Sequence, residues 1–193
     1  MSYKLREVSL PLLPKGHSDI RVLHFSDLHL TPKRKTEIAD IKSFAQLKPD
    51  LVISTGDFLA HRDAVPVALD ALSGLFDVPG LFVFGSNDYY EPMLKNPFSY
   101  LMKDNGVRKH GRDLPWQGLA KSLTQLGWLD LNRSKTTIEV NGTKIEVRGT
   151  DDAHLNRDDY KLVAGDIHQD LNNNNNNNDV ITVKKTKRNW IIS

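Results

Sequence analysis

Short apolar runs alternate with helical patterns in the first half of the chain. Three runs, at residues 20–26, 51–54 and 81–84, are almost continuously apolar, which is typical of strands buried on both faces. Between them, apolar residues recur at helical spacing over residues 38–47 and 67–75. This order of strands and helices requires right-handed crossovers, so it predicts an α/β layered fold built on a parallel sheet.

The pattern changes after the third run. Residues 93–127 are helical or irregular in pattern, and Leu119, Leu123 and Leu126 form a predicted apolar stripe. This segment does not repeat the strand–helix order of the first half. We therefore expect a helix here that packs through those three leucines.

A hairpin is predicted further along the chain. Residues 136–140 and 143–147 alternate between apolar and polar positions around Asn141-Gly142. That dipeptide is the strongest short-range hairpin signal, because both central positions of such a turn need positive φ. We expect an antiparallel hairpin at or near an edge of the sheet.

The end of the chain has a different composition. Residues 172–178 are seven consecutive asparagines, and a basic segment follows them. A polar homopolymer buries too little apolar surface to offset the entropy lost on ordering. The sequence therefore predicts a partial domain over residues 1–164 and a low-complexity, disordered tail over residues 165–193.

Charge and cysteine content exclude several functions. The formal charge of the 193 residues is +2, and residues 172–193 contribute +3 of it, so the rest of the chain is close to neutral. A near-neutral body does not favour a specific nucleic-acid partner. The absence of cysteine excludes disulfides, thiolate zinc sites and cysteine nucleophiles.

No targeting or membrane-spanning segment is predicted. Charged residues at Lys4, Arg6 and Glu7 interrupt the N-terminal apolar residues, unlike the apolar core of a signal peptide. No run approaches the ~20 apolar residues of a transmembrane helix. We expect a cytoplasmic protein, with peripheral membrane contact left open and no prediction of its oligomeric state.

Acidic, imidazole and amide residues follow the three predicted strands. Asp27 and His29 follow the first strand, Asp57 the second, and Asn87 and Asp88 the third. Since ligands bind at the carboxyl ends of parallel strands, we expect these side chains to lie close together. Converging carboxylates repel one another unless cations neutralise them. A mixture of oxygen and imidazole ligands suits Mn, Fe or Zn.

These segments resemble the calcineurin-like metallophosphoesterase superfamily, in particular a bacterial branch of it. The motifs FSDLHL, STGDFLAH and FGSNDYY occur in the family's order, and GTDDAHLNRDDY resembles that branch, so the resemblance covers about residues 18–155. It implies two divalent metal ions (Mn, Fe or Zn), with Asp27 and His29 on the first, Asp57 bridging, and an asparagine of the third motif on the second. It also implies hydrolysis of phosphomonoesters or phosphodiesters by activated water.

The third motif departs from the family pattern. It reads Gly-Ser-Asn-Asp where the family has Gly-Asn-His-Asp, so Ser86 aligns with the metal-binding asparagine and Asn87 with a histidine that assists the leaving group. We take Asn87 as the ligand, because an amide oxygen is the better ligand for such ions. Asp57, Asn87 and Asp88 are the predicted catalytic residues. An amide cannot act as a general acid in the way that an imidazolium can.

The family's later histidine motifs are the second departure. The family completes its site with a strand that ends in histidine and a G-H-x-H motif, and neither occurs after Gly165. We therefore expect a phosphoesterase domain truncated before these motifs. The predicted function is a metal-dependent hydrolase of phosphate esters. The alternative is an inactive remnant with partial metal binding.

Other single residues receive more ordinary interpretations. His24, inside the first run, is predicted to be a hydrogen-bonded core histidine, and His61 a surface residue. Tyr89 and Tyr90, beside the third motif, are predicted to serve packing. His154 follows a predicted strand, so it is either a surface residue or a further group near the site.

Overall fold

The structure is a computed structural model that describes residues 3–13, 15–92, 110–165, 183–185 and 190–192. Its first half contains β1 (Val22–Phe25), α1 (Lys35–Lys42), η1 (Ser43–Leu47), β2 (Leu51–Ser54), α2 (Val65–Leu72), η2 (Ser73–Leu75), β3 (Gly80–Phe82) and α3 (Ser86–Tyr89). The remainder contains α4 (Trp116–Gln125), β4 (Leu129–Asp130), β5 (Ser134–Val140), β6 (Thr143–Gly149), η4 (Ala153–Leu155), η5 (Tyr160–Leu162), β7 (Val183–Lys185) and β8 (Trp190–Ile192).

A parallel sheet forms the centre of the molecule. Its strand order is β1-β2-β3-β4, and every neighbouring pair is parallel. The three strands predicted from the apolar runs are confirmed, and so is the α/β fold. The sequence does not predict β4, which has only two residues and is exposed at both. Because the strands are parallel, all four carboxyl ends lie at one edge of the sheet.

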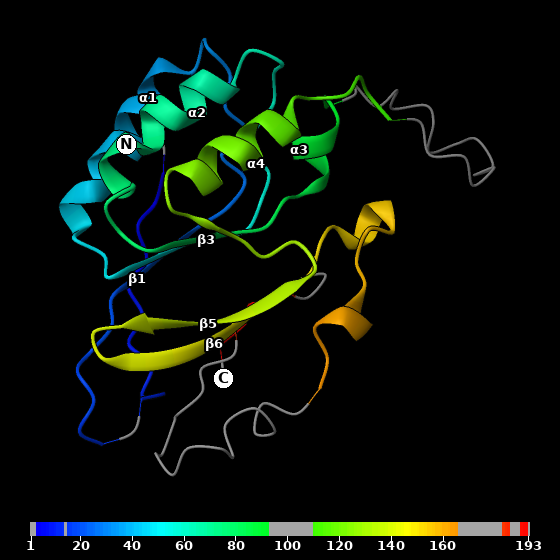
Figure 1. The fold of residues 1–193 in the computed structure, drawn as a ribbon. Helices are drawn as coiled ribbons and strands as arrows, with labels where there is room; N and C mark the ends of the chain where they lie inside the picture. Colours follow the sequence, from blue (N-terminus) through cyan, green and yellow to red (C-terminus); the bar gives the residue numbers. More distant parts are fainter. Residues whose placement is uncertain (1–2, 14, 93–109, 166–182, 186–189, 193) are drawn as a thin grey trace, which may run out of the picture.

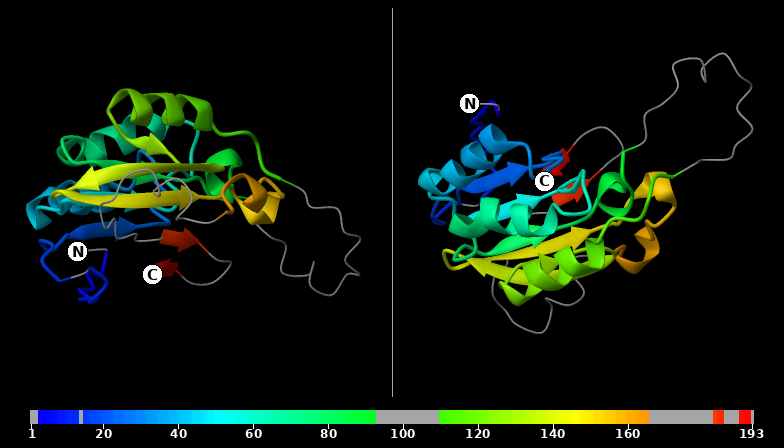
Figure 2. Two further views of the ribbon diagram at one scale, coloured as in Figure 1. Left: turned by 60° about the horizontal axis from the view of Figure 1, so that its bottom comes forward. Right: turned by 90° about the horizontal axis from the view of Figure 1, so that it is seen from above.

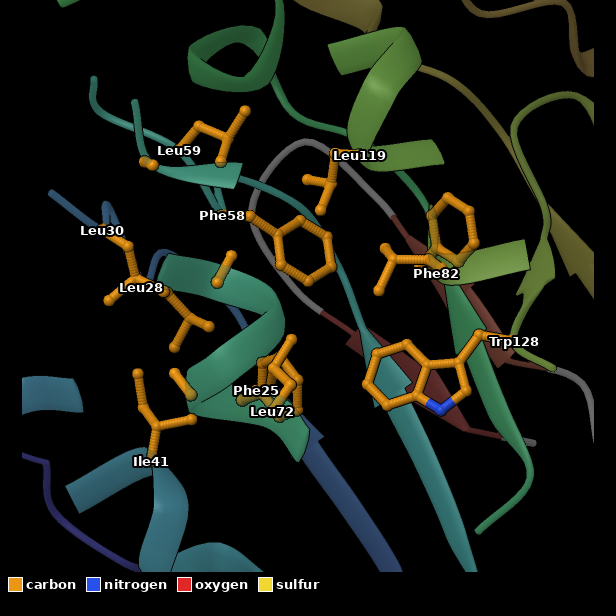
Figure 3. Close-up of a cluster of buried hydrophobic side chains, with 14 of the residues drawn as sticks. Phe25, Leu28, Leu30, Ile41, Phe58, Leu59, Leu72, Phe82, Leu119 and Trp128 are labelled. Atoms are coloured by element: carbon orange, nitrogen blue, oxygen red, sulfur yellow. The ribbon is translucent and has the colours of Figure 1, made fainter. Parts of the chain in front are cut away.

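Helices α1, α2 and α4 cover one face of this sheet (Figure 1). The main hydrophobic core fills the space between the helices and the sheet, and Figure 3 shows its larger side chains. Leu119 and Leu123 of α4 are fully buried there, as predicted. Leu126 is 42% exposed, contrary to the prediction, because α4 ends at Gln125 and the chain turns away.

One glycine of the sheet is required by the core. Trp128 is fully buried, and its indole ring lies directly over Gly80 at the start of β3 (Trp128 is labelled in Figure 3). A Cβ atom at position 80 would lie 2.3 Å from the indole ring. Gly80 is therefore a strand residue that makes room for tryptophan, whereas the apolar run that predicts this strand begins one residue later, at residue 81.

The predicted hairpin lies on the other face of the parallel sheet (Figures 1 and 2). Strands β5 and β6 pair antiparallel, and Asn141 and Gly142 have φ values of 50° and 77°, as the turn requires. The hairpin forms a two-stranded sheet of its own, so its expected place at an edge of the main sheet is wrong. It packs through a second hydrophobic cluster, comprising Leu51, Ile53, Leu81, Val83, Leu131, Val140, Ile145 and Val147.

Strand β1 is less buried than predicted. It is an edge strand, and its side chains alternate between buried and exposed positions. The hairpin's cluster takes its sheet residues from β2 and β3, so the outer face of β1 is left open. His24 is accordingly exposed, so its predicted place in the core is wrong. Its predicted hydrogen bond is present, because its Nε2 lies 3.0 Å from Thr55 Oγ1.

The predicted disordered tail falls largely outside the described residues. Within it, β7 and β8 pair antiparallel, which the sequence does not predict. The boundary between residues 164 and 165 stays a prediction. None of the helices in the described part of the chain has the length and apolar character needed to span a membrane.

Candidate metal centre

The carboxyl ends of β1 and β2 bring three predicted ligands together. One ligand atom each from Asp27, His29 and Asp57 lies within 4.8 Å of the others. His29 Nε2 is 3.9 Å from Asp27 Oδ1 and 3.7 Å from Asp57 Oδ2. The side chains of Asp27, His29 and Asp57 are 65%, 35% and 16% exposed, respectively. The group thus has a solvent-facing side at Asp27 and a more enclosed side at Asp57.

The two loops that carry these residues are joined by backbone hydrogen bonds. The N–H of Asp27 donates to the carbonyl of Gly56 at 3.0 Å, and that of His29 donates to the carbonyl of Asp57 at 2.9 Å. Leu30 and Leu59 then form an isolated parallel bridge. The pairing of the two strands therefore continues through the candidate ligands, which fixes their relative positions.

Left-handed backbone conformations gather at this edge of the sheet. Asp27, His29 and Asp57 have φ values of 57°, 44° and 60°. Non-glycine residues adopt this region infrequently, and it costs free energy that the surrounding structure must supply. The other non-glycine residues with positive φ in the described part of the chain are Lys48, Arg133, Asn141 and Asn156. Strain at all three candidate ligands is typical of a functional site.

Two glycines allow the second and third motifs to approach closely. Gly56 has φ +98°, and a Cβ atom there would lie 2.4 Å from the backbone nitrogen of Gly85. A Cβ atom on Gly85 would lie 2.2 Å from Asp57 Oδ1. Gly56 therefore makes a sharp turn directly before Asp57 that a residue with a side chain could not make without strain. The requirement for glycine at position 85 becomes visible only when both loops are in place.

Asn87 lies against Asp57. Its side-chain Nδ2 donates to Asp57 Oδ2 at 2.8 Å, and its backbone N–H donates to Asp57 Oδ1 at 3.0 Å. The structure therefore brings four predicted residues together, from the ends of three neighbouring strands. The convergence of Asp27, His29, Asp57 and Asn87 is confirmed as geometry, and their role as ligands stays a prediction.

Asp88 is buried beneath this group and has 0% exposure. Its carboxylate accepts hydrogen bonds from the backbone N–H groups of Asp57, Leu59 and Gly85 at 2.7, 3.0 and 3.0 Å. Burial raises the pKa of Asp88 to about 7, with a smaller contribution from the charge of Asp57, and against the lowering effect of the N–H bonds. The side chain thus holds the second and third motifs together from inside the protein.

A second polar cluster lies beside the third motif. The Asp151 side chain is 1% exposed, and it accepts a 2.6 Å hydrogen bond from the Tyr89 hydroxyl. Arg157 Nε lies 3.1 Å from the same carboxylate, and its guanidinium carbon lies 4.1 Å from the centre of the Tyr89 ring. Arg157 is not predicted from the sequence, although it lies within the GTDDAHLNRDDY motif, because its partners follow only from the fold.

Tyr89, His61 and His154 occupy three different environments around the site. Tyr89 is buried and its ring contacts Phe84 and Trp116, so its packing role is confirmed. His61 is a surface residue, as predicted, and its Nδ1 accepts a hydrogen bond from the backbone of Asp63. His154 is exposed, and its backbone N–H donates to Asp152, which caps the short helix η4.

The donor set fits a divalent metal ion. Two carboxylates and an imidazole lie within reach of one point, and Asn87 adds an amide beside them. Such a mixture of oxygen and nitrogen donors suits Mn, Fe or Zn. The fold and this donor set together define a class of α/β proteins with a candidate metal centre at the carboxyl edge of a parallel sheet.

The comparison with protein families agrees with this class. The sequence profile of the calcineurin-like phosphoesterases matches residues 20–192. The chain therefore belongs to this family of metal-dependent hydrolases of phosphate esters, and the resemblance found in its motifs is confirmed. The match extends beyond Gly165, into the segment that is predicted from the sequence to be a tail. No curated protein gives a significant match to the chain.

Proposed function

We propose that this chain hydrolyses phosphomonoesters or phosphodiesters at a centre of two divalent metal ions held by Asp27, His29, Asp57 and Asn87. The observation that carries the proposal is the approach of the Asp27, His29 and Asp57 ligand atoms to within 4.8 Å of one another. Membership of the phosphoesterase family supports the reaction class. Mn, Fe and Zn are the ions that this donor set favours.

Asp57 is the proposed bridging residue because it has candidate ligands on two sides. His29 Nε2 lies 3.7 Å from Asp57 Oδ2, and Asn87 Nδ2 lies 2.8 Å from the same oxygen. Asp27 and His29 would hold the first ion and Asn87 the second, with Asp57 shared. Rotation of the Asn87 amide would turn its oxygen toward an ion in place of the hydrogen bond to Asp57.

Bound ions supply positive charge that stabilises the phosphoryl oxygens, and they lower the pKa of a water molecule. The chain's own residues supply position and access. Asp88 fixes the backbone of Asp57 by accepting a 2.7 Å hydrogen bond from its N–H, so we assign it a positioning role. The exposure of Asp27 leaves the group open to a substrate from solvent. Asn87 can donate a hydrogen bond to the ester but cannot donate a proton to the leaving group.

The test is turnover of p-nitrophenyl phosphate and of its bis ester with added Mn²⁺. We expect the wild-type chain to hydrolyse at least one of them, Asp57→Ala to abolish turnover, and Asp77→Ala to leave it unchanged, because Asp77 is an exposed residue outside the group. Equal turnover by the wild type and Asp57→Ala would contradict the proposal. Metal binding without turnover of either ester would support the inactive remnant instead.

A further inference from the structure

We propose that Asp151 is a positioning residue for the metal centre and acts through Tyr89 on Asn87. The inference rests on the proposed function, since it concerns how the third motif of that centre is held. Asp151 lies in the loop after β6, and Asn87 lies in α3. The two segments are 62 residues apart at the Tyr89–Asp151 hydrogen bond. The proposal is therefore that a remote loop sets the affinity of the centre for its ions.

Helix α3 needs support from outside. It consists of the four residues Ser86–Tyr89, and a helix of one turn has no stability of its own in water. The Asp88 carboxylate accepts hydrogen bonds from the backbone N–H groups of Asp57, Leu59 and Gly85. Tyr89, the next residue, donates a hydrogen bond from its hydroxyl to Asp151. Asn87 is thus carried by a single turn that is held by these two neighbouring residues and by the hydrogen bonds from Asn87 itself to Asp57.

The Asp151 carboxylate is held in place because both of its oxygens have hydrogen-bond partners. Its carboxylate accepts the Tyr89 hydroxyl at 2.6 Å, the backbone N–H of Asp152 at 2.7 Å and Arg157 Nε at 3.1 Å. Arg133 Nε lies 3.9 Å away and adds a second positive charge. A buried carboxylate is costly unless it is paired and hydrogen-bonded, and Asp151 meets this condition through Arg157, the Asp152 N–H and the Tyr89 hydroxyl together.

Arg157 packs its guanidinium group over the Tyr89 ring. Its guanidinium carbon lies 4.1 Å from the centre of the Tyr89 ring and 5.4 Å from that of Trp116. The Tyr89 ring is therefore covered by Arg157 and contacted at its edges by Phe84 and Trp116, with its hydroxyl fixed by Asp151. A shift of the loop after β6 would move Tyr89, and with it the amide of Asn87.

The experiment is a double-mutant cycle read by Mn²⁺ affinity in isothermal titration calorimetry. Tyr89→Phe removes only the hydroxyl and keeps the ring contacts. We expect it to weaken Mn²⁺ binding about tenfold, the lower end of the effect of residues that support metal ligands. In an Asn87→Ala background, Tyr89→Phe should cause no further loss, because Tyr89 acts through Asn87. Asp158→Asn, an exposed carboxylate of the same loop, is the control and should bind as the wild type does.

A purely structural role predicts a different result. In that case the losses from Tyr89→Phe and Asn87→Ala would multiply, and that outcome overturns the inference. Unchanged Mn²⁺ affinity in Tyr89→Phe also overturns it while leaving the proposed function in place. Equal Mn²⁺ binding by the wild type and Asp57→Ala overturns both this inference and the proposed function. Circular dichroism melting of each variant verifies that it is folded. Asp151→Asn keeps an acceptor for the Tyr89 hydroxyl, so it should lose less Mn²⁺ affinity than Asp151→Ala.

Discussion

The close approach of the second and third motifs is tested by Gly56→Ala. The backbone of Gly56 has φ +98°, and an added Cβ atom would lie 2.4 Å from the nitrogen of Gly85 and 2.7 Å from the carbonyl carbon of Phe84. Both contacts are with backbone atoms, which cannot rotate away as a flexible side chain could. The substitution therefore combines a strained conformation with a collision between two loops of the metal centre.

The expected magnitude follows from separating these two effects. Gly127 has a similar φ of +93°, but an added Cβ atom there meets nothing within 4 Å. Gly127→Ala should therefore cost about 1–2 kcal/mol of the free energy of unfolding, from the left-handed conformation alone. Gly56→Ala should cost about 2–5 kcal/mol, because overpacking against a fixed neighbour adds about 1–3 kcal/mol.

Urea unfolding and Mn²⁺ titration of both variants would measure the two effects. Relief of the collision requires the loops after β2 and β3 to separate, so Gly56→Ala should also weaken Mn²⁺ binding, whereas Gly127→Ala should bind as the wild type does. Equal destabilisation by the two substitutions would refute the reasoning. So would a strongly destabilised Gly56→Ala variant that keeps full Mn²⁺ affinity, since the collision would then not reach the centre.

Three further predictions concern the core and the buried acid. Gly80→Ala should destabilise the protein by about 1–3 kcal/mol or more, because the new Cβ atom would lie 2.3 Å from the Trp128 ring; thermal melting measures it. Leu119→Ala should cost about 2–5 kcal/mol in urea unfolding, and Leu126→Ala, at an exposed position, less than about 0.5 kcal/mol. For Asp88, burial raises the pKa from 3.8 to about 7, so the folded state binds more protons over this interval. The stability of the protein in EDTA should therefore fall as the pH rises from about 4 to about 7, and a flat or rising profile would contradict it.

The sequence predicts the parts of the fold that depend on local patterns. Strands β2 and β3 are buried on both faces, so their continuous apolar runs identify them. Strand β4 has two exposed residues, so no apolar run marks it. The exposure of one face of β1 likewise cannot be predicted from its sequence, because it depends on which strands the hairpin covers. Burial of this kind is set by tertiary packing, which a local pattern does not contain.

Some residues of the candidate site can likewise be predicted from the sequence, and others cannot. Asp27, His29 and Asp57 are found from the sequence because each follows a strand, and parallel strands bring their ends together. The burial of Asp88 and the partners of Asp151 are not found, because they depend on bonds between loops that are far apart along the chain. The hydrogen bonds from Asp57 to Asp88 and from Tyr89 to Asp151 span 31 and 62 residues. Motif order locates the centre, and the fold reveals how it is held.

The central claim is that the group around Asp57 binds two divalent ions, and metal stoichiometry tests it most directly. Equilibrium dialysis against Mn²⁺, followed by elemental analysis, would count the ions bound per chain. The account predicts two ions in the wild type and in the Asp77→Ala control, and a loss of both in Asp57→Ala, because the bridging carboxylate serves each of them. An unchanged ion count in Asp57→Ala would contradict the account.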